Sequence, residues 1–131
     1  MVKIEENKFY TEHKKIVPLP APAFVYIPLS QHLGKICDQI QVKSADPVLK
    51  GQVLAFSQAQ VSAPVHASVS GKVTAIQSWP HPMLGACKTI VIENDGRDQP
   101  APELAQALSE KEIRELSPTQ IRERIARAGI V

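Results

Sequence analysis

The stretch SAPVHASVSGKVTAI, residues 62–76, decides the fold. It joins a Pro-Val pair, a run of small residues, a glycine and the alternating segment KVTAI. A proline lacks the N–H that a strand ladder needs, and a glycine permits a sharp turn into the next strand. The alternation places Val73 and Ala75 on one face and Thr74 and Ile76 on the other. The stretch therefore predicts a tightly turning β-sheet.

A second copy of this pattern lies in DPVLKGQVLAF, residues 46–56. Pro47-Val48 and Gly51-Gln52-Val53 correspond to Pro64-Val65 and Gly71-Lys72-Val73 of the later copy. Two similar units predict two thin sheets related by a pseudo-twofold axis. Small side chains would let the sheets approach closely, namely Ala63, Ala67, Ser68 and Ser70.

Other strands are expected from β-branched content and alternation at residues 24–29, 38–43, 53–56, 58–63 and 87–94. SWPHPMLGA, residues 78–86, is interpreted as an irregular loop held by two prolines. After Asp98 the strand signal ends. Ser117-Pro118-Thr119-Gln120 is a capping-box helix start, and Gly129 is a suitable helix stop. The chain is thus expected to divide into an extended arm (1–23), a β domain (24–98) and a helical extension (99–131).

Composition narrows the class of protein. The 131 residues are 44% hydrophobic but only 5% aromatic, so the core must be aliphatic. A net charge of +2 implies no strong field for nucleic acid, and no apolar run approaches the roughly 18 residues of a membrane span. The first 15 residues show no signal-peptide core, so we expect the chain in the cytosol or at its membrane face. Cys37 and Cys87 are then expected to be reduced, buried thiols.

The side chains that could carry chemistry do not form a recognisable site in sequence. None of the four histidines, His13, His32, His66 and His81, has another ligand at metal-binding spacing. We favour a structural, hydrogen-bonded role for His66, with contact to a neighbouring domain or subunit as the alternative. We expect His81 to order its loop, with surface recognition as the alternative. Trp79 is interpreted as a cap on the core, and a partner anchor is its alternative.

Known catalytic and cofactor motifs do not occur either. Ser62, Ser68 and Ser70 lack the nucleophile-elbow pattern of a hydrolase. Neither a Gly-x-Gly-x-x-Gly segment nor a phosphate-binding loop is present. Two cysteines cannot supply the four thiolates of a [4Fe-4S] cluster. No catalytic, cofactor-binding or metal residue is therefore assigned in this chain.

The repeated segments resemble the barrel-sandwich hybrid, the fold of biotinyl and lipoyl carrier domains. SADPVLKGQVLAF and SAPVHASVSGKV match its two segments of the type G-D-x-V-x-K-G-Q-x-L and A-P-x-x-G-x-V. The resemblance implies a mainly β fold, with a C-terminal helical extension added here. A carrier domain presents its modified lysine on the hairpin between these segments, but FSQAQVSA contains no lysine. A soluble carrier or adaptor module is kept as the alternative function.

A more specific resemblance covers Pro18 to Val131. VYIPLSQHLGK, PVHASVSGKV and RIARAGIV, in this order, are similar to the N-terminal part of the C subunit of the Rnf electron transport complex. The chain has FYTEHKK where that family often has Gly-Gly-Ile-His-Pro. A divergent Rnf C protein and a related flavin-dependent reductase subunit therefore both stay open.

The resemblance implies a longer subunit in which a Gly-rich flavin segment follows the position of Val131. It implies FMN, NADH and two [4Fe-4S] clusters in that remainder and no cofactor in this part. It also implies that the other domains of the same subunit and other Rnf subunits are the partners. The expected function is a non-catalytic scaffold in a membrane-associated NADH:ferredoxin oxidoreductase coupled to ion transport. The expected location is peripheral, on the cytoplasmic side of the inner membrane, without direct insertion.

Overall fold

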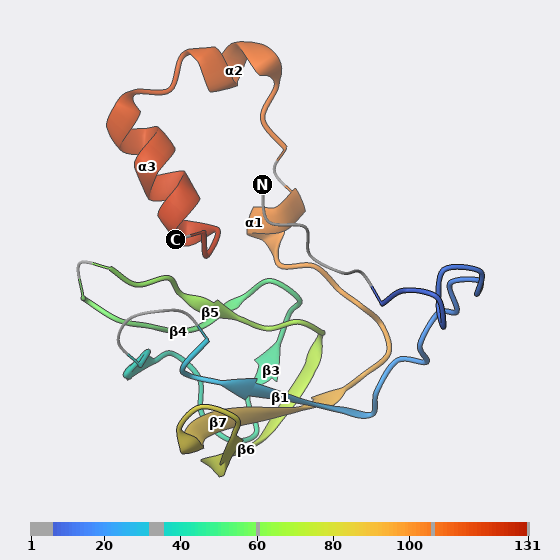
Figure 1. Ribbon diagram of the computed structural model, residues 1–131. Helices are drawn as coiled ribbons and strands as arrows, with labels where there is room; N and C mark the ends of the chain where they lie inside the picture. The colour runs from blue at the N-terminus through green and yellow to red at the C-terminus, as the bar shows by residue number, and fades with distance from the viewer. Residues whose placement is uncertain (1–6, 32–35, 60, 106, 131) are drawn as a thin grey trace.

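The computed structural model describes residues 7–31, 36–59, 61–105 and 107–130. A β domain carries a projecting N-terminal arm on one side and a chain of short helices above it (Figure 1). The strands are β1 Phe24–Pro28, β2 Gln39–Ile40, β3 Pro47–Val48, β4 Val53–Phe56, β5 Val65–His66, β6 Gly71–His81 and β7 Gly85–Asn94. The helices are α1 Pro102–Ala105, α2 Glu110–Arg114 and α3 Pro118–Arg127.

Two antiparallel sheets enclose the core, which confirms the mainly β barrel-sandwich prediction. One has the strand order β1-β7-β6-β3 and the other β2-β4-β5. The core is aliphatic: its buried members are Ile27, Leu29, Cys37, Val42, Val48, Leu54, Ala55, Val65, Ala67, Val73, Ile90 and Ile92. Leu54 and Ala55 are adjacent in β4, and both are fully buried. Both faces of this short strand are therefore covered.

The two sequence repeats exchange strands, which explains the pseudo-twofold arrangement. Pro47 and Val48 of the first copy pair with Lys72 and Gly71 of the second. At the equivalent position of the other sheet, β5 of the second copy pairs with β4 of the first. Each Pro-Val segment thus completes the sheet begun by the glycine-led segment of the other copy. Neither copy can bury its apolar face alone, so the two copies form one folding unit.

The alternation predicted for KVTAI is wrong in one respect. A bulge between Val73 and Ala75 shifts the pairing of β6 with β7, so that Val73 lies opposite Ile92 and Ile76 lies opposite Ile90. A bulge inserts one extra residue and returns the following side chains to the earlier face. Ile76 consequently packs against the core on the same side as Val73.

The segment interpreted as an irregular loop is instead the end of a long hairpin. β6 continues through Trp79 to His81 and pairs residue by residue with β7. β3 covers only the first two residues of β6, so the rest of β6 is an edge strand. A proline such as Pro80 is tolerated on an edge because no ladder partner needs its missing N–H. β1, which ends at Pro28, lies at the opposite edge of this sheet.

Two other strand predictions need correction. The strand expected at 38–43 is reduced to Gln39–Ile40, because the Asp46 carboxylate accepts a hydrogen bond from the Lys43 backbone N–H and turns the chain. The strand expected at 58–63 does not form in the described residues of this segment. Its chain is held as a loop instead, where the Ser62 hydroxyl bonds the carbonyls of Ser57 and Ala59.

Small residues do line the contact between the sheets, with one exception. Ala63, Ala67 and Ser70 are buried, whereas Ser68 is exposed. The buried Ser70 hydroxyl donates to the Asp95 carboxylate at 2.7 Å and accepts from the Gln99 backbone N–H at 2.9 Å. The Arg97 backbone N–H and then this hydroxyl lower the pKa of Asp95. The network fixes the chain where it leaves the last strand.

Helix α3 starts as predicted. Ser117 caps α3 in a capping box with Gln120, and Pro118 stands in its first turn. Ser109 caps α2 in the same way, and its contacts lower the pKa of Glu112. The extension is also connected to the β domain, since Lys50 exchanges backbone hydrogen bonds with Gln99 and Ala101.

Candidate functional site

His66 joins the β domain to the helical extension. It lies in β5, and its Nε2 is 2.9 Å from the carbonyl oxygen of Arg127 at the end of α3. A carbonyl oxygen can only accept, so Nε2 carries the proton and donates. The contact agrees with the interpretation of His66 as a structural, hydrogen-bonded side chain. Its partner lies in the helical extension of the same chain, so contact with a neighbouring domain or subunit stays a prediction.

Gly129 completes this contact. It has φ +76°, which ends α3 as the sequence predicts, and a Cβ at this position would lie 3.1 Å from His66 Cε1. Contacts this short force the neighbouring atoms apart. A glycine is therefore suited to this position both by its backbone conformation and by the closeness of the imidazole ring.

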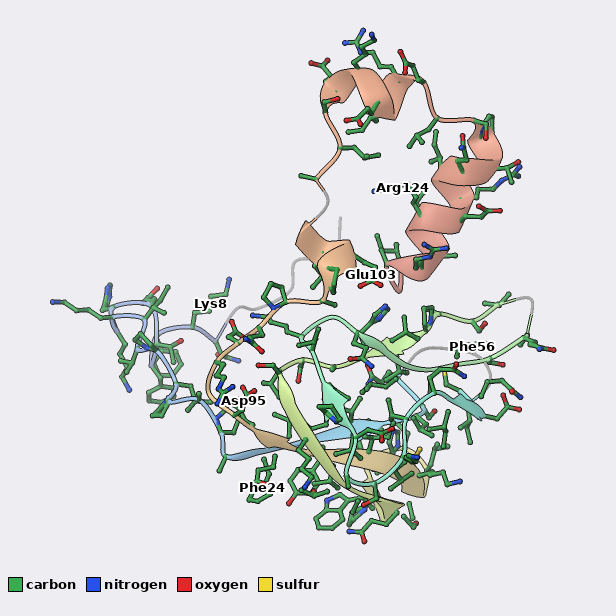
Figure 2. All side chains as sticks on the ribbon, turned by 180° about the vertical axis from the view of Figure 1, so that it is seen from behind. Lys8, Phe24, Phe56, Asp95, Glu103 and Arg124 are labelled. Atoms are coloured by element: carbon green, nitrogen blue, oxygen red, sulfur yellow. The ribbon has the colours of Figure 1, made fainter. Side chains whose placement is uncertain are left out.

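A cavity of about 800 Å³ lies between the extension and the sheet β2-β4-β5. Figure 2 shows Arg124 and Glu103 on the extension and Phe56 across from them on the β domain. The lining is Gln41, Gly51, Gln52, Val53, Phe56, His66, Glu103, Leu104, Arg124, Arg127 and Ala128. Two arginines and one glutamate make its rim mixed in charge. Sequence reasoning missed this cavity because one wall comes from residues 41–66 and the other from residues 103–128, which are distant in the sequence.

We expect the substitution His66→Ala to release the end of α3 from the β domain. The net value of one such hydrogen bond is about 1 kcal/mol, so amide exchange in α3 should rise roughly fivefold. Hydrogen-exchange mass spectrometry of the full chain measures it. His81→Ala is the matched control, because His81 lies at the opposite hairpin and should leave exchange in α3 unchanged. Equal exchange in wild type and His66→Ala would show that the contact does not hold the helix.

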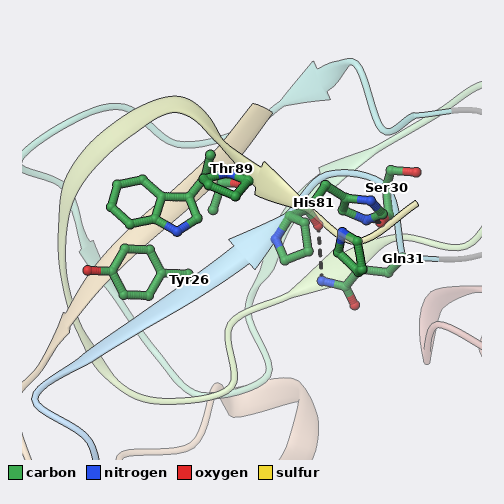
Figure 3. Close-up of a pocket in the computed structure, with 9 residues that line it drawn as sticks. Tyr26, Ser30, Gln31, His81 and Thr89 are labelled. Atoms are coloured by element: carbon green, nitrogen blue, oxygen red, sulfur yellow. Dashed lines mark hydrogen bonds between the residues drawn. The ribbon is translucent and has the colours of Figure 1, made fainter. Parts of the chain in front are cut away.

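A second, smaller hollow of about 340 Å³ lies on the outer face of the four-stranded sheet (Figure 3). The rings of Tyr26 and Trp79 stack there, with centroids 4.6 Å apart and planes 28° apart. Tyr26 is 44% exposed and Trp79 38% exposed. Trp79 therefore covers the outside of the sheet, and its indole stays accessible. The sequence offered no signal for this stack, because its partners are 53 residues apart.

His81 orders the hairpin turn beside this hollow, as predicted. Its Nε2 donates to the Ser30 carbonyl at 3.1 Å, and its Nδ1 accepts from the backbone N–H groups of Met83 and Leu84 at 3.2 Å each. Three partners fix the ring in a single tautomer. Figure 3 shows His81 next to Ser30 and Gln31, where the β6–β7 turn meets the end of β1.

The remaining candidate residues do not converge. The side chain of His13 is 89% exposed and lies 3.5 Å from Glu12, and His32 falls outside the described residues. Cys37 and Cys87 are buried free thiols, as predicted. Burial and then Asp38 raise the pKa of Cys37. In the described ranges no three His, Cys, Asp or Glu side chains gather closely enough to hold a metal ion.

The hairpin that would carry a modified lysine has a different composition here. The chain has no lysine between Gly51 and Gly71. Lys50, just before this stretch, forms an ion pair with Asp98 at 2.6 Å. An amine held in this way is not presented at a hairpin tip.

None of the helices in the described part of the chain is long and apolar enough to cross a bilayer.

Comparison with known proteins gives a consistent result. Residues 2–97 match a family model described as the RnfC barrel sandwich hybrid domain. The chain is 46% identical over 95 residues to the C subunit of the proton-translocating ferredoxin:NAD(+) oxidoreductase complex of Clostridium ljungdahlii, covering 72% of this chain and 21% of that protein. It is 37% identical over 129 residues to the C subunit of the ion-translocating oxidoreductase complex of Rhodobacter capsulatus, covering 97% and 24%.

A third relative, the C subunit of the Na(+)-translocating ferredoxin:NAD(+) oxidoreductase complex of Acetobacterium woodii, is 38% identical over 110 residues, with 84% of this chain and 24% of that protein covered. The chain thus spans between a fifth and a quarter of the length of these relatives.

Proposed function

Because the chain belongs to the family of RnfC barrel sandwich hybrid domains, we propose that it is the non-catalytic N-terminal scaffold of an Rnf-type C subunit. That larger protein would belong to a membrane-associated NADH:ferredoxin oxidoreductase that couples electron transfer to ion transport. A related flavin-dependent reductase is the less favoured parent, because the relatives named above are all C subunits of ion-translocating complexes.

The observation that carries the scaffold role is the docking of α3 on β5 through His66 and Arg127. This contact holds the last helix of the chain against the sandwich. We propose that 1–23 is an arm, that 24–98 is the sandwich, and that 99–131 leads to a domain that binds flavin and NADH. A domain that holds the segment leading to its successor in this way can fix the orientation of redox centres without binding them.

The residues present do not fit the redox cofactors that the family implies. A [4Fe-4S] cluster requires four thiolates, whereas both cysteines here are buried and the Cys37 thiol bonds the Ala63 carbonyl at 3.3 Å. A Gly-rich cradle for the phosphate of FMN is not present in the sequence. We therefore assign FMN and two clusters to the remainder of the parent protein, and NADH reaches the complex through that remainder.

The proposed partners are the other domains of the same C subunit and the other Rnf subunits. A net charge of +2 provides no attraction for nucleic acid. The proposed location is the cytoplasmic side of the inner membrane, with the chain held there by its partners and not by direct insertion.

The test is to express this chain and the remainder of a relative's C subunit as separate polypeptides with one affinity tag. We expect the two to copurify, with flavin and iron-sulfur absorption only in the remainder. His66→Ala should weaken the association, and His81→Ala is the control that should leave it unchanged. Stoichiometric flavin in the purified chain, or failure to copurify, would contradict the scaffold role.

The carrier alternative predicts that a ligase increases the intact mass of the chain, whereas the scaffold role predicts no change. Coexpression with biotin ligase and with lipoyl ligase should leave the intact mass unchanged, because the hairpin has no lysine. A biotin acceptor domain expressed in the same cells is the positive control. An adduct on Lys50 or Lys72 would establish the carrier role and overturn the scaffold.

A further inference from the structure

The outer hollow of the four-stranded sheet has the composition of a groove for a proline-rich segment. Aromatic rings and prolines predominate in the lining, which comprises Tyr26, Pro28, Ser30, Gln31, Trp79, Pro80, His81, Pro82 and Thr89. Stacked aromatic rings that stay accessible are the surface on which polyproline II helices dock in other proteins. We call this surface the aromatic groove.

The N-terminal arm supplies a segment of matching chemistry. In Val17-Pro-Leu-Pro-Ala-Pro22 every second residue is proline. Each proline fixes its own φ and pushes the residue before it into the extended region, so all six residues are restricted to polyproline II geometry. Little conformational entropy is left for this segment to lose on binding.

The arm is also an uncovered apolar surface. Ile16 is 98% exposed, Val17 82% and Leu19 89%. A contiguous exposed apolar segment of this kind is a mark of an interaction site. The backbone carbonyl groups of a polyproline II helix make no hydrogen bonds within the helix. The Trp79 indole N–H and the Tyr26 hydroxyl are hydrogen-bond donors that line the groove.

The arm of a given copy is directed away from its own groove. Asn94 at the end of β7 fixes the base of the arm, with its backbone N–H bonded to Ala23 O and its side-chain amide to Pro22 O. The groove lies toward the other end of β7, where Leu29 bonds Lys88. Figure 1 shows the arm projecting on the side opposite the β6–β7 turn. The rigid prolines next to the anchor oppose a reversal of the chain.

From this geometry we propose that the arm segment Val17–Ala21 of one copy, which precedes the anchored Pro22, docks in the aromatic groove of a second copy. The exchange is reciprocal: each copy offers one arm and one groove, so a twofold dimer fills both. Two simultaneous contacts strengthen an association that each arm alone would make weakly. The proposed scaffold role does not depend on this surface.

Trp79 is the single tryptophan of the chain, so its fluorescence reports directly on the groove. A synthetic peptide of residues 14–23, KKIVPLPAPA, is titrated into the full chain at a concentration low enough to keep it dissociated. We expect a saturable change in Trp79 emission. The control peptide has glycine in place of Pro18, Pro20 and Pro22, and it should bind about tenfold more weakly because it is not preorganised.

Sedimentation of the full chain provides the second measurement. The wild type should show a monomer–dimer equilibrium that depends on concentration. Both Tyr26→Ala, in the groove, and the double substitution Pro18→Gly/Pro20→Gly, in the arm, should shift it to monomer while circular dichroism stays unchanged. A dimer that survives both variants would overturn the proposal. An emission unaffected by the peptide, or a control peptide that binds equally well, would overturn it too.

Discussion

Gly71→Ala is expected to lower the free energy of unfolding by about 3–5 kcal/mol, a large part of the stability of a domain this size. Gly71 stands where the second repeat enters β6 and pairs with both Val48 and Asn94. A Cβ at this position would overlap the carbonyl oxygen of Glu93 and lie 3.3 Å from Asn94 Cα. These are backbone atoms of the neighbouring strand, so only a displacement of β6 from β7 can relieve the overlap. Urea unfolding followed by circular dichroism measures the loss.

Gly85→Ala is the matched control for this substitution. Gly85 begins β7 with φ +70°, and a Cβ there would meet no atom within 4 Å. Its cost is limited to the backbone conformation, about 1–2 kcal/mol. Equal losses for the two variants would show that close approach of the strands at Gly71 is not what the fold requires.

The repeat around these glycines made the fold predictable, since it is visible within a few residues of each copy. The exchange of strands between the copies was not predictable in detail. Pro47 pairs with Lys72 of the other copy, and a local sequence pattern does not show which distant segment a strand pairs with. The bulge at Val73 was missed for a related reason. Alternation alone places Ile76 on the outer face, and only pairing with the long strand β7 shows the extra residue.

The candidate sites were less predictable than the fold. The helix start at Ser117 follows from capping chemistry that acts within four residues, and it formed as expected. The contact of His66 with Arg127 depends instead on where the extension folds back, 61 residues later. The same is true of Tyr26 on Trp79. Such surfaces can be found only when it is known which residues lie close together in the folded chain, and a single sequence does not give this information.

The second large effect is expected in the core. Leu54→Ala should lower the free energy of unfolding by about 3–4 kcal/mol, because the side chain is fully buried in β4 between the two sheets. The core of this sandwich is thin and aliphatic, so few neighbours can move in to fill the space that the missing carbons leave. The expected result is a lower urea midpoint with an unchanged slope, which marks a loss of stability and not of compactness.

Leu84→Ala separates this cavity effect from the general cost of removing a leucine. Leu84 is 51% exposed in the turn between β6 and β7, so its truncation should cost less than about 1 kcal/mol. A difference of at least about 2 kcal/mol between the two variants is therefore expected. If Leu54→Ala were as mild as Leu84→Ala, the sheets would not meet across β4. The two repeats would then be held together by their exchanged strands alone, and the sandwich would have no common core.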